Sequence, residues 1–375
     1  MLRDLFYNYI PDLLGSLYFN FNLNLIPSRD HPLDIQDIKK ICILATSGIG
    51  NLIMLTPMIR SLRRGISDAK ISVLVAPNGA RYVLEGGELV DQIFVLDDKK
   101  VFKKIREEWP DLTIAATHRG YMRAKRAFRT GAMYRIGFDY DYEDKTNTSF
   151  FLTHTISLDN SKPEVEQGLN LLRPLGVPPI RKLYMHIGEK DRDFADDLLR
   201  ASGINNSDLL FGLHIGPGPD DKVRGWRCWP LENFAELSDR LAQDYGVKVL
   251  IFGGKSESKT AEIVINKMNN KPLLLAGKTT LNQTAAVMER CNLFISNDSG
   301  PMHIAAASGT KVIGIFGPTD SKIHGPYGES CYTVESSIDC RPCHHPHDPP
   351  IQCDKRECLE SISVDMVMEK VRSVM

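Results

Sequence analysis

Residues 292–320, NLFISNDSGPMHIAAASGTKVIGIFGPTD, decide the fold class of this chain. An apolar run of strand character breaks at the polar turn NDSGP, and an Ala-rich helical segment then leads into a second strand-like run at 312–316. This order places the turn and the helix N-terminus at the carboxyl edge of a parallel sheet, where free N–H groups and the helix dipole favour an anion. The turn is therefore a candidate phosphate site, although Asp, Ser and Pro are also typical of an ordinary helix start.

The composition is typical of a globular protein with more than one domain. A chain of 375 residues with 42% hydrophobic and 25% charged residues can bury a sizeable core and is long enough for two domains. Lys plus Arg (46) nearly balances Asp plus Glu (47), which argues against nucleic acid as a partner. The sequence shows neither a signal-peptide pattern nor an apolar run that could span a bilayer, so we expect a cytoplasmic protein.

The first forty residues, 1–40, form an extension that differs from the rest of the chain. Apolar residues recur there at helical spacing, Pro11 interrupts them, and the aromatic-rich segment YFNFNLNLI follows. Such an extension can pack on its own body, contact another subunit of a homo-oligomer, or lie peripherally on the inner membrane. We favour packing on its own body, because the polar face lacks the Lys/Arg excess of interfacial helices.

An α/β pattern occupies residues 41–178. It begins with a strand-like run at 41–45, the turn SGIGN and a helical stretch at 52–64. Gly48 and Gly50 in the turn permit a ligand to approach the backbone closely. The third glycine of a dinucleotide fingerprint is missing, and the next strand ends without the ribose-binding acid, so an NAD site is disfavoured. The further strand candidates in this half are 71–76, 92–96 and 112–116.

The strand at 112–116 ends at His118 and Arg119, where open parallel sheets bind their ligands. A helical stretch with a basic run follows. We interpret most of its charges as a solvated helix face; the alternative is a cleft wall that meets an anionic acceptor. Beyond Gly131 we expect irregular, aromatic-rich chain. The basic residues of the run are Arg119, Arg123, Lys125, Arg126 and Arg129.

The second half, residues 179–335, repeats the architecture after a linker, VPP. Two similar α/β halves joined by a short linker are expected to form a deep cleft. A Cys-rich segment at 336–360 and a C-terminal helix within 361–375 complete the chain. The strand candidates of this half are 209–215, 247–252, 273–275 and the two of the opening stretch; its helix candidates include 231–245, 256–267 and 280–290.

Four segments carry a resemblance to a known family. They are GIGN with LTP after the first strand, RCWP before LENFAELSDRL, VLIFGGKSESK, and FISNDSGPMHIAAASGTKVIGIFGPTD. Together they resemble glycosyltransferase family 9, the ADP-heptose heptosyltransferases, over about residues 40–335. The resemblance implies a GT-B fold: two Rossmann-like domains that face a cleft, with the acceptor on the N-terminal domain and the nucleotide sugar on the C-terminal one.

The resemblance also implies a donor site. Asp298 begins a turn that matches the turn of the family which binds the donor diphosphate and sugar through its backbone N–H groups. Arg227 falls where the family commonly has a Lys on the phosphates, and its planar fork suits phosphate as well. Glu257 matches an acid that contacts the nucleoside ribose, although a helix first turn favours an acid in any case. The full set of donor-binding candidates is Arg227, Gly253, Gly254, Glu257, Asp298, Ser299 and Gly300.

The first glycine turn departs from the family pattern. The family normally reads GIGD there, and that aspartate is the proposed base that deprotonates the acceptor hydroxyl. This chain has Asn51, and an amide cannot accept the proton. His118 and Asp111 are the candidate replacements, although Asp111 also suits a cap at the start of its strand. Asn51 can still orient the acceptor by hydrogen bonds. The acceptor-side loop candidates are Gly48, Gly50 and Arg119.

Four of the eight cysteines cluster near the C-terminus, in the pattern C-x2-C-x9-C-x4-C with three histidines between. Four soft thiolates are the number that a tetrahedral zinc or iron site needs, so we predict a structural metal finger. Disulfides, which are rare in the cytosol, and free thiols are the alternatives. Family members with a comparable four-Cys finger modify autotransporter proteins on serine hydroxyls. The predicted ligands are Cys340, Cys343, Cys353 and Cys358.

We therefore expect an inverting GT-B glycosyltransferase. It would transfer a heptose or related sugar from a nucleoside diphosphate sugar, ADP-heptose by the resemblance, to a hydroxyl on lipopolysaccharide, another surface glycan or a protein. A GT-B enzyme, which the resemblance implies, needs no catalytic divalent metal, so we expect none. The rival hypotheses are a nucleotide-sugar 2-epimerase-like GT-B enzyme and a non-catalytic nucleotide-sugar-binding module, which Asn51 suggests.

Overall fold

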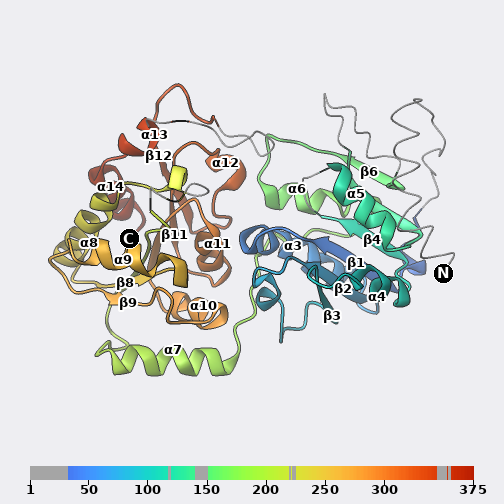
Figure 1. The fold of residues 1–375 in the computed structure, drawn as a ribbon, viewed down its shortest axis with the longest axis horizontal. Coiled ribbons are helices and arrows are strands. Elements are labelled where there is room, and N and C mark those ends of the chain that lie inside the picture. Colours follow the sequence, from blue (N-terminus) through green and yellow to red (C-terminus); the bar gives the residue numbers. More distant parts are fainter. Residues whose placement is uncertain are drawn as a thin grey trace. The chain divides into compact units, whose positions relative to one another are not determined.

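A computed structural model describes residues 33–116, 120–139, 151–218, 221, 225–343, 353 and 356–375. The chain divides into two compact units, Met1–Lys182 and Leu183–Met375. Figure 1 traces the elements of each unit. Most of the N-terminal extension predicted at 1–40, and with it the proposed membrane or subunit contact, lies outside the described residues.

The first unit is built on a parallel six-stranded sheet in the order β3-β2-β1-β4-β5-β6. Its central strand β1, KICILA, is buried along nearly its whole length, as expected for a parallel strand with helices over the sheet. The strands are β1 (Lys40–Ala45), β2 (Lys70–Val75), β3 (Gln92–Val95), β4 (Leu112–Ala115), β5 (Tyr134–Asp139) and β6 (His154–Ser157). The helices are α3 (Ile49–Gly65), α4 (Val101–Glu107), α5 (Gly120–Arg129) and α6 (Glu164–Asn170), with short 3-10 turns η1 (Ile35–Asp37), η2 (Ala80–Val83) and η4 (Arg173–Leu175).

The second unit has a parallel sheet in the order β12-β11-β10-β7-β8-β9. Helix α14 lies beside α8, and both contribute to an apolar core of this unit. The strands are β7 (Leu210–His214), β8 (Lys248–Phe252), β9 (Leu273–Leu274), β10 (Leu293–Asn297), β11 (Val312–Phe316) and β12 (Cys331–Glu335). The helices are α7 (Glu189–Ala201), α8 (Leu231–Tyr245), α9 (Ser258–Ile265), α10 (Leu281–Glu289), α11 (Gly300–Ala307), α12 (Ser321–His324), α13 (Glu357–Glu360) and α14 (Val364–Val374), with 3-10 turns η5 (Gly225–Arg227) and η6 (Lys255–Glu257).

Both units have the same strand order, which reads 3-2-1-4-5-6 when each unit is numbered from its own first strand. This is the doubly wound order, and it confirms the predicted α/β fold with two Rossmann-like halves. In such a sheet the chain leaves in opposite directions on either side of the first strand. The topological switch points therefore lie between β1 and β4 in the first unit and between β7 and β10 in the second.

Three strands and four helices, α4, α7, α12 and α13, differ from the sequence-based expectation. The chain after Gly131 is not irregular: β5 pairs with β4 in register Leu112↔Tyr134, and β6 pairs with β5. Strand β12 and these four helices were also not predicted. Strands β5, β6 and β12 extend the sheets toward their edges and are only partly buried, so they lack the continuous apolar run that marks β1 and β10.

Within the described residues, no helix is long and apolar enough to cross a membrane.

Candidate functional site

The carboxyl end of β10 leads directly into helix α11, as the opening stretch of sequence predicts. Ser299 is the N-cap residue, with extended backbone angles, and its side chain makes no capping hydrogen bond to α11. Its hydroxyl instead donates to the carbonyl of Asn297 (3.1 Å) and lies 3.0 Å from Nδ1 of His214. The start of α11 at Gly300 therefore presents backbone N–H groups and the positive end of a helix dipole without a side-chain cap, which suits an anionic ligand.

Asp298 fixes the neighbouring cation. Its carboxylate is 7% exposed, accepts a hydrogen bond from Thr319 Oγ1 (2.8 Å) and pairs with Arg227 Nη1 (3.2 Å). The Arg227 guanidinium also lies over the ring of Trp226, 5.1 Å from its centroid. Within the part of the chain that the structure describes, Nε of Arg227 is buried without a hydrogen-bond partner. Asp298 thus orients Arg227 beside the start of α11. Its carboxylate is occupied by the contacts with Thr319 and Arg227.

Asn297, which sequence reasoning missed, ties the RCWP loop to the sheet. Its Oδ1 accepts from the backbone N–H of Trp229 (2.9 Å), and its Nδ2 donates to the carbonyl of Ile215 (2.8 Å). Gly216 follows Ile215 with φ of +85°, and a Cβ there would lie 3.3 Å from Asn297 Nδ2. Because only glycine adopts this conformation readily, the position keeps the loop close to the end of β10. The ends of β7 and β10 therefore meet through one buried amide at the switch point.

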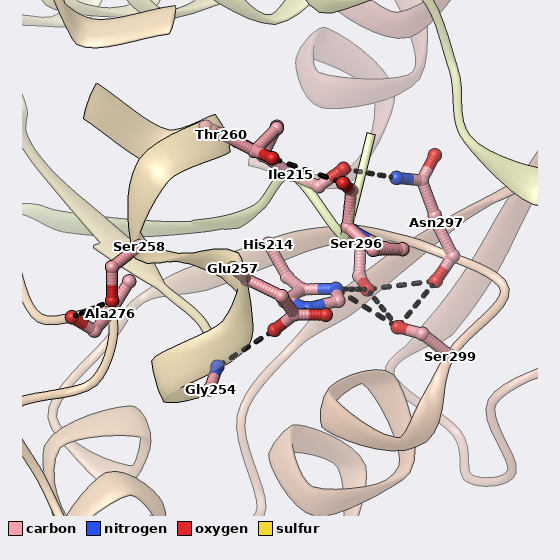
Figure 2. Close-up of polar contacts among 11 residues, drawn as sticks. His214, Ile215, Gly254, Glu257, Ser258, Thr260, Ala276, Ser296, Asn297 and Ser299 are labelled. Atoms are coloured by element: carbon pink, nitrogen blue, oxygen red, sulfur yellow. Dashed lines mark hydrogen bonds and ion pairs between the residues drawn. The ribbon is translucent and has the colours of Figure 1, made fainter. Parts of the chain in front are cut away.

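Figure 2 shows how a buried histidine connects the other predicted donor turn to this one. His214, at the end of β7, is 2% exposed; its Nε2 lies 3.3 Å from Glu257 Oε2 and its Nδ1 3.0 Å from Ser299 Oγ. The same carboxylate oxygen of Glu257 accepts from the backbone N–H of Gly254 (2.7 Å), next to Gly253. Glu257 therefore holds the glycine turn after β8. His214 had no local sequence signal beyond its place at a strand end.

In the first unit, the turn after β1 is the start of helix α3. The helix begins at Ile49, three residues before the expected position, with Gly48 as its N-cap and no side-chain capping hydrogen bond. Gly50 and Asn51 therefore lie in the first helical turn. Asn51 Nδ2 donates to Oε2 of Glu164 (3.2 Å), the first residue of α6 and only 7% exposed. Sequence reasoning missed Glu164.

Two arginines of α5 point to the same turn, contrary to the predicted solvated helix face. Arg123 is 8% exposed, donates from Nη2 to Ser47 Oγ (3.1 Å) and also bonds Thr46 Oγ1. Arg126 donates from Nη1 to the same Thr46 oxygen (3.0 Å). Burial lowers the pKa of the Arg126 guanidinium from its usual value. The turn after β1 thus carries two cations at its base.

Asp111, a predicted replacement base, lies at the other end of β1 from this turn. Its Oδ2 accepts the backbone N–H groups of Lys39 (2.9 Å) and Lys40 (2.8 Å), at the amino end of β1. Asn51 follows the carboxyl end of the same strand. Asp111 therefore secures the start of β1 by accepting two backbone N–H groups, a structural role like the strand cap that the sequence also suggests. The other candidate base, His118, and the loop candidate Arg119 lie outside the described residues.

The four clustered cysteines do not assemble a metal site in the described part of the chain, where no three His, Cys, Asp or Glu side chains form a group that could hold a metal. Burial first, and then the electrostatic influence of Cys343, Cys340 and Cys353, raises the pKa of the Cys358 thiol to about 11. Arg341 anchors the first pair, donating to the Ser336 carbonyl (2.8 Å), the Gly317 carbonyl and the Thr319 carbonyl (3.4 Å). Thr319 is the residue that also bonds Asp298.

Comparison with known proteins identifies similar glycosyltransferases. Among curated proteins, lipopolysaccharide heptosyltransferase 3 of Escherichia coli is 26% identical over 297 residues, which are 75% of this chain and 84% of that protein. Among solved structures, a glycosyltransferase family 9 protein of Veillonella parvula is 25% identical, with a TM-score of 0.75 over 92% of this chain and 98% of that one.

Two further structures share the fold at lower identity. The E. coli heptosyltransferase WaaC with ADP is 18% identical, with a TM-score of 0.63 over 90% of this chain and all (100%) of that one. The iron-containing dodecameric glycosyltransferase TibC of enterotoxigenic E. coli is 13% identical, with a TM-score of 0.56 over 91% of this chain and 77% of that one. The model of glycosyltransferase family 9 (heptosyltransferase) matches residues 99–351. With two doubly wound units and a donor-type turn at the start of α11, this chain belongs to glycosyltransferase family 9, the heptosyltransferases.

Proposed function

We propose that this glycosyltransferase transfers a heptose from ADP-heptose to a hydroxyl group of a lipopolysaccharide-type acceptor, with inversion at the anomeric carbon. The observation that carries the proposal is Arg227, held by Asp298 beside the uncapped start of α11. A guanidinium and a helix N-terminus together form a site for a diphosphate. The relatives named for heptosyl transfer, and the WaaC structure with ADP, support ADP-heptose as the donor.

The second unit would stabilise the departing ADP. As the bond between the sugar C1 and the diphosphate oxygen breaks, negative charge grows on the diphosphate. Arg227 and the N–H groups at Gly300 are fixed before the reaction, so they stabilise that charge with little reorganisation. Glu257 holds the turn at Gly254, which would present the nucleoside side of the site. Because these groups would stabilise the leaving diphosphate, the proposed reaction needs no catalytic divalent metal.

The first unit would hold the acceptor. The turn residues 46–51 are only partly buried, and Arg123 and Arg126 lie beneath them. Two guanidiniums at this edge favour an acceptor that carries a carboxylate or phosphate near its reacting hydroxyl. A lipopolysaccharide-type glycan fits this requirement better than a neutral serine side chain of a protein.

The proposal predicts acceptor-dependent release of ADP. The purified chain is incubated with ADP-heptose and with core-oligosaccharide acceptors that carry or lack anionic groups, while ADP and the mass of the acceptor are measured. We expect one heptose added per acceptor molecule, faster with the anionic acceptors, and slower or no transfer from GDP- and UDP-sugars. An isomerised donor without transfer would point instead to a 2-epimerase, and donor binding without turnover on any acceptor to a binding module.

We further propose that Cys340, Cys343, Cys353 and Cys358 hold one structural zinc or iron ion. Four thiols at the spacing C-x2-C-x9-C-x4-C are a donor set that suits either metal. Metal analysis of the purified protein is expected to find about one zinc or iron per chain. The double variant C340S/C343S should lose most of that metal and melt at a lower temperature, whereas C291S, at a buried cysteine outside the cluster, should retain it. A well-folded, metal-free wild-type protein contradicts this proposal.

A further inference from the structure

Asn51 occupies the position where the family normally has its base, but it is not isolated. Its amide Nδ2 lies 3.2 Å from Oε2 of Glu164, which comes from a segment 113 residues further along the chain. Helices α3 and α6 pack together, and at Gly168 a Cβ would lie 3.1 Å from Leu55 Cδ2. This close packing brings the first turns of both helices to the same place. The carboxylate missing from position 51 is thus present next to it, on another helix.

The surroundings of Glu164 suit an ionised carboxylate. It is the first residue of α6, whose N-cap, Pro163, supplies no side-chain hydrogen bond, and an acidic residue is favourable in a first helical turn. The Asn51 amide donates to it, and Arg123 and Arg126 bind Ser47 and Thr46 of the turn that precedes Asn51. Burying a carboxylate costs folding free energy unless charged or hydrogen-bonding groups compensate it, so a carboxylate kept at such a position suggests a function.

We propose that Glu164 is the general base of this enzyme and that Asn51 positions it. The inference rests on the proposed transfer reaction. The acceptor hydroxyl gives its proton to the Glu164 carboxylate while its oxygen forms the new bond to C1 of the sugar. The bond between C1 and the diphosphate oxygen breaks, and its electron pair leaves with ADP. Asn51 then has a role that an amide can fill, because it holds the carboxylate and needs to accept no proton.

The variant E164Q separates this role from a structural one. A glutamine keeps the size of the side chain, and its Oε1 still accepts the hydrogen bond from Asn51, but it cannot take a proton. We expect turnover at saturating donor and acceptor to fall at least about 100-fold, within the range lost with a general base. Affinity for ADP and the melting temperature should stay close to those of wild type.

The swap variant N51D/E164Q provides the rescue. It keeps one carboxylate and one amide in the pair but moves the carboxylate to position 51, where the family normally carries it. We expect the turnover of this variant to be at least about tenfold higher than that of E164Q. The matched control is E108Q, which removes the charge of a partly exposed carboxylate of the same unit that pairs with Lys70 (2.8 Å), and its turnover should equal that of wild type.

The outcomes distinguish this inference from the proposed function. An E164Q enzyme that retains wild-type turnover overturns the role of Glu164. So does a swap variant that folds, binds ADP and remains as inactive as E164Q. Loss of ADP binding or of the folded state in E164Q assigns Glu164 a structural role and also overturns the inference. A wild-type protein that transfers no sugar contradicts the proposed function itself, and the inference falls with it.

Discussion

Replacing Arg227 with alanine is expected to weaken ADP binding by about 1.5 to 3 kcal/mol, the scale of a hydrogen bond to a charged group. That loss is a factor of about 10 to 150 in the dissociation constant. The reason is geometric: Asp298 and the Trp226 ring hold the guanidinium in place before the diphosphate arrives, so little binding energy is spent on ordering it. Calorimetric titration with ADP measures the change directly.

Two companion variants make this result specific. R227K keeps the charge but loses the planar fork and its packing on Trp226, so we expect an affinity between those of wild type and R227A. R240A is the control, because Arg240 is a partly exposed arginine of the same unit that pairs with Asp365 (2.8 Å) at the start of α14. Its removal should leave ADP affinity unchanged. Equal affinities of R227A and wild type would remove Arg227 from the donor site.

Replacing Trp229 with alanine is expected to lower the free energy of unfolding by about 3 to 5 kcal/mol, the usual cost of deleting a large buried aromatic side chain. The indole is fully buried, packs edge-on against Phe234 with ring centroids 5.0 Å apart, and donates from Nε1 to the Ile362 carbonyl (2.9 Å). Alanine leaves a cavity and removes the indole hydrogen bond where the C-terminal segment meets the RCWP loop.

Denaturant unfolding, followed by a signal from the second unit, measures this loss. W109A serves as the control, because Trp109 is 61% exposed and lies in the first unit. Its substitution should change the unfolding free energy by no more than about 0.5 kcal/mol. A loss below about 1 kcal/mol in W229A would mean that the surrounding core closes over the cavity.

The sequence predicted those parts of the molecule whose signals are local. The turn before α11 was predicted because a buried apolar run, a polar turn and a helix start lie within a few residues of one another. Arg227 was found through the resemblance of RCWP to a family motif. Strands β5 and β6 were missed because their partly buried residues do not form an apolar run, and they become strands only by pairing with β4 and with each other.

The interactions that organise the two sites join distant parts of the chain, and no local sequence pattern predicts them. His214 and Glu257 are 43 residues apart, and Asn51 and Glu164 are 113 apart. The basic run on α5 was interpreted as solvated because charge runs usually are, yet Arg123 is turned inward to Ser47. Asp111 looked reachable from the glycine turn because strand direction was not used to separate the two ends of β1.

Arg341 has a consequence for how this chain can change during evolution. Its side chain binds the carbonyls of Gly317 and Thr319, while its neighbours Cys340 and Cys343 begin the thiol cluster. Thr319 in turn bonds Asp298. Substitution of Arg341 is therefore expected to loosen a support of the turn that carries Asp298, even if all four cysteines stay in place. Selection on that turn would then preserve Arg341 independently of the cysteines beside it.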